Sequence, residues 1–417
     1  MHKISQRVIS DYLIVGGGIL YLVLSQWNLN FTIYLLPFIV GFLIKEYKTE
    51  KIDVTLNLLD FSVCGLLLIQ LLISVLSSYK ANSISHIIGL IQFFVYYLFL
   101  RYSVFTSKNK QDSFLISASA WFFILGLLTL FSFLFFQFNI EYEGFSDIIN
   151  FRSLYHPLGQ LSNDWVGFLI FFLTITTVVL FKTSHKYLKL GAFVTCIILG
   201  YCLVLSFSRG AYLSLICFFI FGLAGVLYQC KSKAFYLVAL IAVLVVLSIP
   251  FKKEAIETLG MVNTSSQQRS ISGRSVLWQG ALEMFADNPL QGVGQGNFLI
   301  NRNAYLEKSP DSFYTGRVTN SFLQLLAEQG VLGAIAWGSV LIICLIFLVK
   351  GIFYEKVDSQ RRILFTIILS GILAYGIREM TFSSFFQNSG LQLILAIILS
   401  FVSANSLPKN YEFSRKI

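Results

Sequence analysis

Two arginines of this chain lie in apolar surroundings where chemistry with an anion could take place. Arg209 falls in the run LVLSFSRGAYLSL, and Arg378 falls in AYGIREMTFSSFF, where Glu379 follows it directly. An arginine inside such a run costs several kcal/mol unless it reaches the interface or finds a partner. A guanidinium never deprotonates, and its planar fork binds oxyanions through two hydrogen bonds. We therefore predict a phosphate or pyrophosphate clamp. The alternative is a pair of interfacial side chains with a local Arg378–Glu379 contact.

Two further arginines precede polar stretches of the chain. Arg274 begins GRSVLWQGALEMFADNP, in which apolar residues recur at helical spacing. Arg317 precedes TNSFLQLLAEQGVLG, an otherwise apolar segment that carries Asn320 and Glu328. Hydrogen-bonding side chains at the mouth of an apolar helix mark a candidate functional site.

The elements that must position these residues are membrane helices. Of the 417 residues, 56% are hydrophobic and 12% are charged, against about 25% charged in soluble domains. Continuous apolar runs of roughly 20 residues predict transmembrane helices, and they do not alternate as barrel strands do. We predict an all-α polytopic bundle of about twelve spans, near residues 8–25, 29–44, 56–78, 84–105, 114–138, 161–181, 188–206, 210–229, 234–250, 320–349, 361–380 and 388–404.

The basic residues predict the orientation of this bundle. With the N-terminus in the cytoplasm, most of the 31 Lys and Arg residues fall on inner segments, as the positive-inside rule requires. Several of the others lie in one long outer loop, and long loops escape the rule. Both termini are then cytoplasmic, and the arginines above lie at the outer face. The net charge of +10 therefore reflects topology and not nucleic-acid binding.

Three segments follow from this layout. Residues 1–250 hold spans one to nine, residues 251–319 form an outer loop with amphipathic helices, and residues 320–417 hold three spans and a cytoplasmic tail. In the loop, SGRSVLWQGALEMFADNP predicts a helix that stops at Asn-Pro. The next segment, GVGQG, lacks the pattern of a nucleotide-binding loop, so we expect a tight turn or a close backbone approach.

Aromatic and sulfur-containing residues have simpler explanations. The loop aromatics are Trp278, Tyr305, Phe313 and Tyr314. They either line a sugar path or pack the loop onto the bundle, and Trp278 falls on the apolar face of its predicted helix. The six cysteines lie in or beside apolar spans without a CxxC pair, and the four histidines are scattered. We expect packing roles for the cysteines and no metal site.

Four motifs occur in a familiar order. SFSRG, GRSVLWQGALEMFADNPLQGVGQGNF and TNSFLQLLAEQGVLG, together with LSNDWVGFL, resemble the O-antigen ligase and O-antigen polymerase superfamily of bacterial membrane glycosyltransferases. The resemblance implies a GT-C-like helical fold and an inverting enzyme without a metal or nucleotide cofactor. It implies a glycan donor linked to undecaprenyl pyrophosphate and a glycan or lipid acceptor at the outer face of the cytoplasmic membrane. Other polysaccharide-assembly proteins are further candidate partners.

The resemblance also implies residue roles. Family arginines that contact the donor pyrophosphate correspond to Arg209 and Arg274, and Arg378 is added from the predicted topology. We expect the catalytic residues to be Arg209, Arg274, Arg378 and Glu379. We expect the substrate-binding residues to be Arg317, Asn320, Glu328, Trp278, Tyr314, Asn163 and Asp164.

One position departs from the ligase pattern. Thr319 stands where related ligases usually carry a His that assists the acceptor. Threonine is no base near neutral pH, so the departure favours a polymerase, or a ligase with another base. Glu379 is the first candidate, and Glu328, Asp164 and His156 are alternatives that structural roles also explain. Late proton loss would make leaving-group stabilisation by the arginines the larger effect.

The sequence thus predicts a polymerase of O-antigen or another surface polysaccharide. The first alternative is a ligase that moves finished glycan to lipid A core, another lipid or a protein. The second alternative is a flippase or transporter. Transporters place polar groups at the midplane of broken helices and often contain inverted repeats. Neither feature is expected here, because the centres of the spans are nearly free of charge.

Overall fold

The computed structural model describes residues 15–18, 55–139, 162–252, 256, 265–306, 317–353 and 358–406, and regular structure in these ranges is helical. The first two predicted spans, the loop aromatics Phe313 and Tyr314, and His156 lie wholly or mostly outside the described residues. The helices are α3 (Leu58–Leu76), α4 (Lys80–Phe99), α5 (Lys108–Asn139), α7 (Ser162–Lys182), α8 (Lys186–Leu205), α9 (Arg209–Gln229), α10 (Lys231–Ser248), α12 (Ser265–Asp287), α13 (Phe298–Leu306), α14 (Ser321–Phe353), α15 (Ser359–Glu379) and α16 (Ser389–Asn405). A π-helical turn, Leu100–Val104, extends α4.

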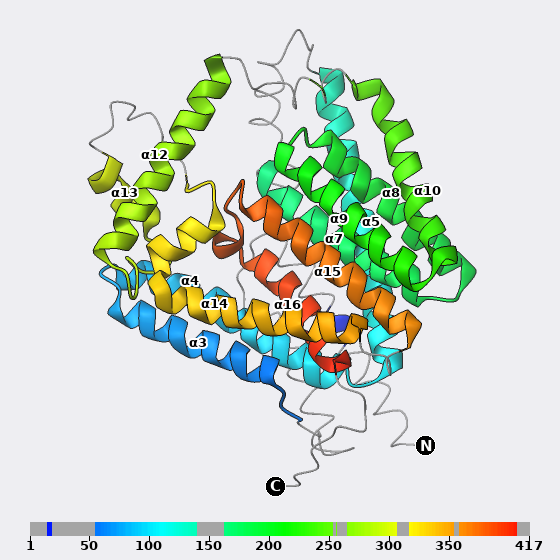
Figure 1. The fold of residues 1–417 in the computed structure, drawn as a ribbon, viewed down its shortest axis with the longest axis horizontal. Helices are drawn as coiled ribbons and strands as arrows, with labels where there is room; N and C mark the ends of the chain where they lie inside the picture. The colour runs from blue at the N-terminus through cyan, green and yellow to red at the C-terminus, as the bar shows by residue number, and fades with distance from the viewer. Residues whose placement is uncertain are drawn as a thin grey trace.

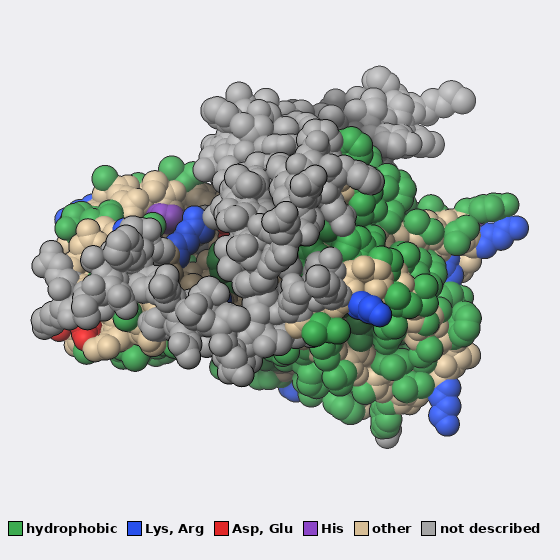
Figure 2. All heavy atoms as spheres, turned by 90° about the horizontal axis from the view of Figure 1, so that it is seen from above, with side chains coloured by type: hydrophobic (Ala, Val, Ile, Leu, Met, Phe, Trp, Pro, Cys, Tyr) green, Lys and Arg blue, Asp and Glu red, His purple; other side chains and the backbone are tan. Residues whose placement is uncertain are grey.

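Nine helices of the described ranges are long and apolar enough to cross a membrane, which confirms a polytopic helical protein. They are α3, α4 with its π-helical turn, α5, α7, α8, α9, α10, α14 and α15. The predicted spans in these ranges match them with end shifts of a few residues, and α5 begins at Lys108, earlier than expected. In Figure 2, hydrophobic side chains cover most of the described surface of the helix bundle, with Lys and Arg mainly at its extremities. Such a surface suits contact with lipid.

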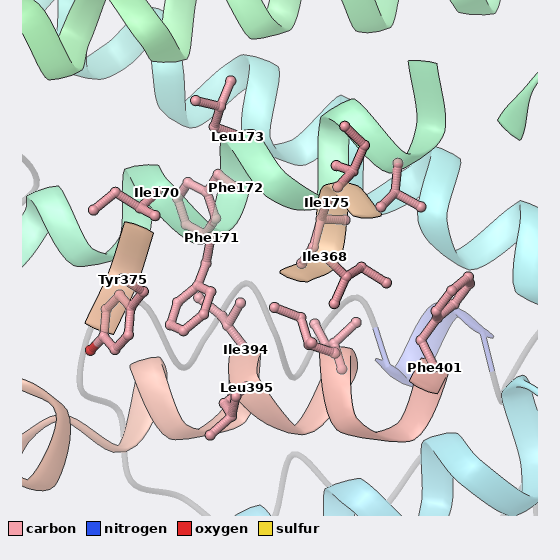
Figure 3. Packing of buried hydrophobic residues seen from close by; sticks show 14 of the residues in the cluster. Ile170, Phe171, Phe172, Leu173, Ile175, Ile368, Tyr375, Ile394, Leu395 and Phe401 are labelled. Atoms are coloured by element: carbon pink, nitrogen blue, oxygen red, sulfur yellow. The ribbon is translucent and has the colours of Figure 1, made fainter. Parts of the chain in front are cut away.

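The helix α7 forms the centre of the bundle. Residues 164–181 of this helix are all buried, and α5, α8, α15 and α16 pack around it. Figure 3 shows Phe171 of α7 beside Tyr375 of α15 and near Ile394 of α16. A helix that is apolar on all sides is expected inside a bundle. Its first turn carries Asp164, which is buried among these helices and their connections.

Small residues let α15 approach its neighbours closely. A Cβ atom on Gly371 would lie 2.2 Å from Oγ1 of Thr174 in α7, and one on Gly225 of α9 would lie 2.3 Å from Cγ2 of Thr366. Membrane helices associate through such close backbone contacts, because lipid provides no hydrophobic driving force between them. The ends of α7, α9 and α15 are thus held at fixed positions.

The loop helix α12 confirms one expected boundary and corrects another. It ends at Asp287, directly before Asn288-Pro289, as predicted, but it begins at Ser265 and not at Ser272. Its apolar face packs on Val318 and on Ala327 of α14, and Trp278 and Tyr305 lie against this cluster. Figure 1 shows α12 and α13 at one end of the molecule, away from α5, α8 and α10.

The helix α14 is interrupted at Gly330, where φ is 59° and ψ is −159°. The break frees backbone groups on both sides, and the segment 288–297 binds them. Val293 N–H donates to Ala327 O at 2.9 Å, Gly294 N–H to Glu328 O at 2.8 Å, Val331 N–H to Pro289 O at 2.8 Å and Leu332 N–H to Leu290 O at 3.0 Å. The expectation that no span is broken is therefore wrong. A single glycine in an apolar run does not by itself predict a helix break. The segment 288–297, which binds the backbone groups beside Gly330, lies about 30 to 40 residues earlier in the chain.

The glycine segment forms the expected tight turn. Gly292, Gly294 and Gly296 have φ values of 65°, 97° and 76°, a region that strongly favours glycine. A Cβ atom on Gly292 would lie 2.4 Å from the carbonyl carbon of Glu328. The Asn297 amide fastens the turn to the α3–α4 connection, because it donates to the Ser77 and Ser83 hydroxyls at 2.8 and 3.0 Å. The loop is thus locked onto the bundle next to the break.

Candidate functional site

The end of α15 and the first turn of α14 meet at a buried ion pair. Arg378 and Glu379 are 1% and 4% exposed. Arg378 Nη1 donates to Glu379 Oε1 and to the Ser384 hydroxyl. Ser321, the first residue of α14, donates its hydroxyl to Glu379 Oε2. This pair therefore joins α14 to α15 and fixes the position of both helix ends.

Further donors occupy the Glu379 carboxylate. Oε2 also accepts from the backbone N–H groups of Ser384 and Phe385, each at 3.2 Å, and the Ser384 hydroxyl lies 3.0 Å from Oε1. A carboxylate has about four lone-pair sites, so these contacts leave little room for an acceptor proton. The geometry favours the local Arg378–Glu379 pair that the sequence left open. It does not support Glu379 as the first candidate base.

We expect Glu379→Ala to destabilise the protein more than Arg378→Ala/Glu379→Ala does. The single change breaks a buried ion pair by removing one partner, which costs about 3–5 kcal/mol, whereas the double change removes both charges. Thermal unfolding of the purified protein in detergent measures the difference. Asp358→Ala is a control at the opposite end of α15, where the carboxylate accepts from Arg361 N–H at 2.8 Å; loss of such a cap costs about 1 kcal/mol. A double variant as unstable as the sum of its singles contradicts the pairing.

Asp164 lies at the N-terminal end of α7, close to this pair. It is 6% exposed, and its Oδ2 lies 3.7 Å from Nη1 of the half-exposed Arg317. Arg378 and Glu379 are also within electrostatic reach of Asp164. The structure thus brings together four predicted site residues from α7, α15 and the entry to α14.

Arg209 and Arg274 approach each other from different elements. Arg209 is the first residue of α9, Arg274 lies on α12, and both side chains are exposed. Surrounding protein atoms lower the pKa of the Arg274 guanidinium, and the positive charge of Arg209 lowers it further. Two guanidinium groups at this range repel each other. An anion between them would remove the repulsion, so the pair is suited to bind one.

The Arg209 end of α9 adjoins the end of α15. A Cβ atom on Gly210 would lie 2.5 Å from the Thr381 hydroxyl oxygen, and that hydroxyl donates to the Arg378 carbonyl at 2.8 Å. Arg209 follows a turn in which Phe207 has φ of 45°, an unusual value for a bulky residue. The turn and the Gly210 contact place Arg209 beside the Arg378 segment, so all four predicted arginines belong to one region.

Other predicted site residues have contacts that explain them structurally. Glu328 accepts from Gly296 N–H at 3.0 Å and Phe298 N–H at 3.1 Å, so its carboxylate holds the glycine turn. Asn320 caps α14, because its Oδ1 accepts from Phe322 N–H at 2.9 Å. Trp278 lies against the apolar cluster on which α12 packs, which fits the packing role that the sequence left open beside sugar contact. The Asn163 side chain and Tyr314 lie outside the described residues.

Residues that the sequence did not single out complete the region. Ser321 and Ser384 bind Glu379, and Gly330 allows the break in α14. The two serines lie within TNSFL and TFSSFF, but serine is common at helix ends. Only their contact with a buried carboxylate distinguishes them.

Comparisons with known proteins agree with the motifs. Residues 194–338 match a family model described as O-antigen ligase. Over 101 residues the chain is 28% identical to the exopolysaccharide production protein ExoQ of Rhizobium meliloti (strain 1021), and the aligned part covers 23% of each chain. The chain thus matches less than a quarter of this relative's length.

The family match covers Arg209, Arg274 and Arg317 and ends before Arg378. It runs from α8 through the loop that holds α12 and α13 and past the break in α14. The chain is therefore an integral membrane protein in which residues 194–338 resemble the O-antigen ligase family.

Proposed function

We propose that this protein transfers a glycan from an undecaprenyl-pyrophosphate donor to an acceptor sugar hydroxyl, as a surface-polysaccharide polymerase at the outer face of the cytoplasmic membrane. The observation that carries the proposal is the approach of Arg209 to Arg274, close enough for their charges to interact. Both lie in the range that matches the O-antigen ligase family. The name of the relative ExoQ, an exopolysaccharide production protein, supports the same kind of substrate.

In this mechanism the arginines stabilise the leaving group. The acceptor oxygen attacks the anomeric carbon from the side opposite the pyrophosphate, so the linkage inverts. Charge develops on the departing pyrophosphate, and fixed guanidinium donors are worth most where charge develops. Arg209 and Arg274 act directly on the phosphates without a metal ion. The buried Arg378–Glu379 pair holds the ends of α14 and α15 that surround them.

Position 319 favours a polymerase over a ligase. The related ligases usually carry a His there, and this chain carries Thr319. In a polymerase the acceptor is itself a lipid-linked repeat, and its carrier resembles the carrier of the donor. This shared carrier brings the acceptor hydroxyl to the donor, so a residue dedicated to holding the acceptor is needed less. A ligase that uses another base is the second candidate, because the same arginines would serve it.

The break in α14 is the one observation that favours a transporter. In transporters, unwound backbone groups line the substrate path. Here the freed carbonyl and N–H groups beside Gly330 are bound by Val293, Gly294, Pro289 and Leu290. They are therefore not available to a substrate, and the enzyme proposal explains the arginines better.

Analysis of glycans in a gene-deletion strain tests the proposal. Loss of a polymerase is expected to leave single repeats attached to the acceptor, visible as one short band on a polysaccharide gel. Long chains retained on undecaprenol would instead identify a ligase. Lipid-linked repeats trapped on the cytoplasmic side would identify a flippase and contradict the proposed transfer reaction. Complementation with the unchanged gene is the control.

A further inference from the structure

Asp164 has a carboxylate oxygen for which the described part of the chain supplies no partner. The residue is 6% exposed, and Oδ2 faces Arg317 at 3.7 Å. Oδ1 is buried and accepts no hydrogen bond within the described part of the chain. A buried polar atom without a partner is costly and calls for an explanation. Glu328 and Glu379, the other acidic candidates, have both oxygens bound.

A second polar atom without a partner among the described residues lies on the segment that carries Arg317, the residue paired with Asp164. Thr319 Oγ1 is buried and makes no hydrogen bond to described residues. Thr319 follows Arg317 by two residues, so their Cα atoms are within about 7 Å of each other, and Arg317 contacts Asp164. A carboxylate oxygen that can only accept and a hydroxyl that can donate suit the two sides of a sugar hydroxyl.

This pair of atoms adjoins the arginines. Asp164 is within electrostatic reach of Arg378, and the Arg378 carbonyl accepts from Thr381. Thr381 packs on Gly210, whose neighbour Arg209 interacts with Arg274. An acceptor hydroxyl at Asp164 and a pyrophosphate at Arg209 would therefore lie on two sides of the same region.

We propose that Asp164 is the catalytic base and that Thr319 orients the acceptor hydroxyl; this inference rests on the proposed glycan transfer. The acceptor O–H bond breaks and its proton passes to Asp164 Oδ1. The acceptor oxygen forms the new bond to the anomeric carbon. The bond from that carbon to the pyrophosphate oxygen breaks, and its electron pair leaves with undecaprenyl pyrophosphate. Asp164 then returns the proton to water beside the half-exposed Arg317.

A structural role for Asp164 is the competing explanation. Acidic residues are common in the first turn of a helix, where they interact with its dipole by about 0.3–1 kcal/mol. That role predicts a loss of stability when the charge is removed. The base role predicts a loss of turnover in a protein that still folds and still binds the donor headgroup.

The test uses the full-length protein in proteoliposomes with lipid-linked repeats extracted from the deletion strain. Asp164→Asn is expected to lower kcat by about 10²–10⁴-fold, the range for loss of a general base, while binding of undecaprenyl pyrophosphate stays unchanged. Asp112→Asn is the matched control, because Asp112 is ion-paired to Lys182 at the opposite end of α7. Wild-type turnover in Asp164→Asn, or an equal loss of undecaprenyl pyrophosphate binding, would overturn the base.

A second variant distinguishes loss of the base from misfolding. Thr319→His, added to Asp164→Asn, places an imidazole where an acceptor hydroxyl is expected. The kcat of this double variant should be at least about tenfold higher than that of Asp164→Asn alone. A folded double variant without any recovery contradicts the shared position of Asp164 and Thr319. Failure of the proposed function gives a different result. The wild-type protein itself would then join no repeats, whether or not it binds undecaprenyl pyrophosphate.

Discussion

Arg209→Ala and Arg274→Ala are each expected to abolish visible polymer in cells while the protein still inserts into the membrane. Loss of one preorganised donor to a developing anion lowers kcat by about 10²–10³-fold. Lysine at either position should restore little, because an ammonium lacks the planar fork that binds a phosphate through two hydrogen bonds. The length distribution of surface polysaccharide on a gel measures the effect.

Arg274→Ala is expected to keep or slightly raise the thermal unfolding temperature. In the absence of an anion the charge of Arg209 disfavours the charged Arg274 guanidinium, so removal of the Arg274 charge relieves that repulsion. Arg302→Ala is the control, because Arg302 lies on α13 of the same loop and its Nε donates to the neighbouring Asn303. Unchanged chain length in Arg209→Ala would contradict the clamp.

Gly330→Ala should cause the second large effect, a joint loss of stability and activity. The backbone there has φ of 59° and ψ of −159°, a conformation that costs about 1–3 kcal/mol in a residue other than glycine. A Cβ atom would also lie 2.5 Å from the carbonyl carbon of Leu290. We expect the 288–297 segment to leave the break, which exposes backbone groups that the membrane region cannot satisfy.

Gly338→Ala is the matched control in the same helix. No heavy atom lies within 4 Å of a Cβ atom built on Gly338, and alanine is the better helix former by about 1 kcal/mol. Its unfolding temperature should stay the same or rise. Gly292→Ala should resemble Gly330→Ala, because its Cβ would meet the Glu328 backbone from the other side of the break. A Gly330→Ala protein with unchanged unfolding temperature and activity would show that the loop is not held there.

The sequence by itself determined the helical membrane architecture and several boundaries. Apolar runs of spanning length can satisfy their backbone groups only as helices, so α3 to α10 and α14 to α16 follow from local composition. Asn288-Pro289 stopped α12 where expected, because proline cannot continue a helix. The glycines at 292, 294 and 296 indicated the tight turn, and the motif order indicated a resemblance that the O-antigen ligase model also finds over residues 194–338.

The tertiary structure alone decided which polar groups meet. Glu379 and Asp164 are both carboxylates beside apolar helices, yet Glu379 is bound by Ser321 and Ser384, whereas one oxygen of Asp164 has no hydrogen-bond partner among the residues that the structure describes. The difference comes from helices that are distant in sequence and packed at fixed angles. The break at Gly330 was likewise hidden, because its hydrogen-bond partners lie in the preceding loop. Local sequence fixes how far a helix runs, whereas the environment of a buried charge depends on which segments pack around it.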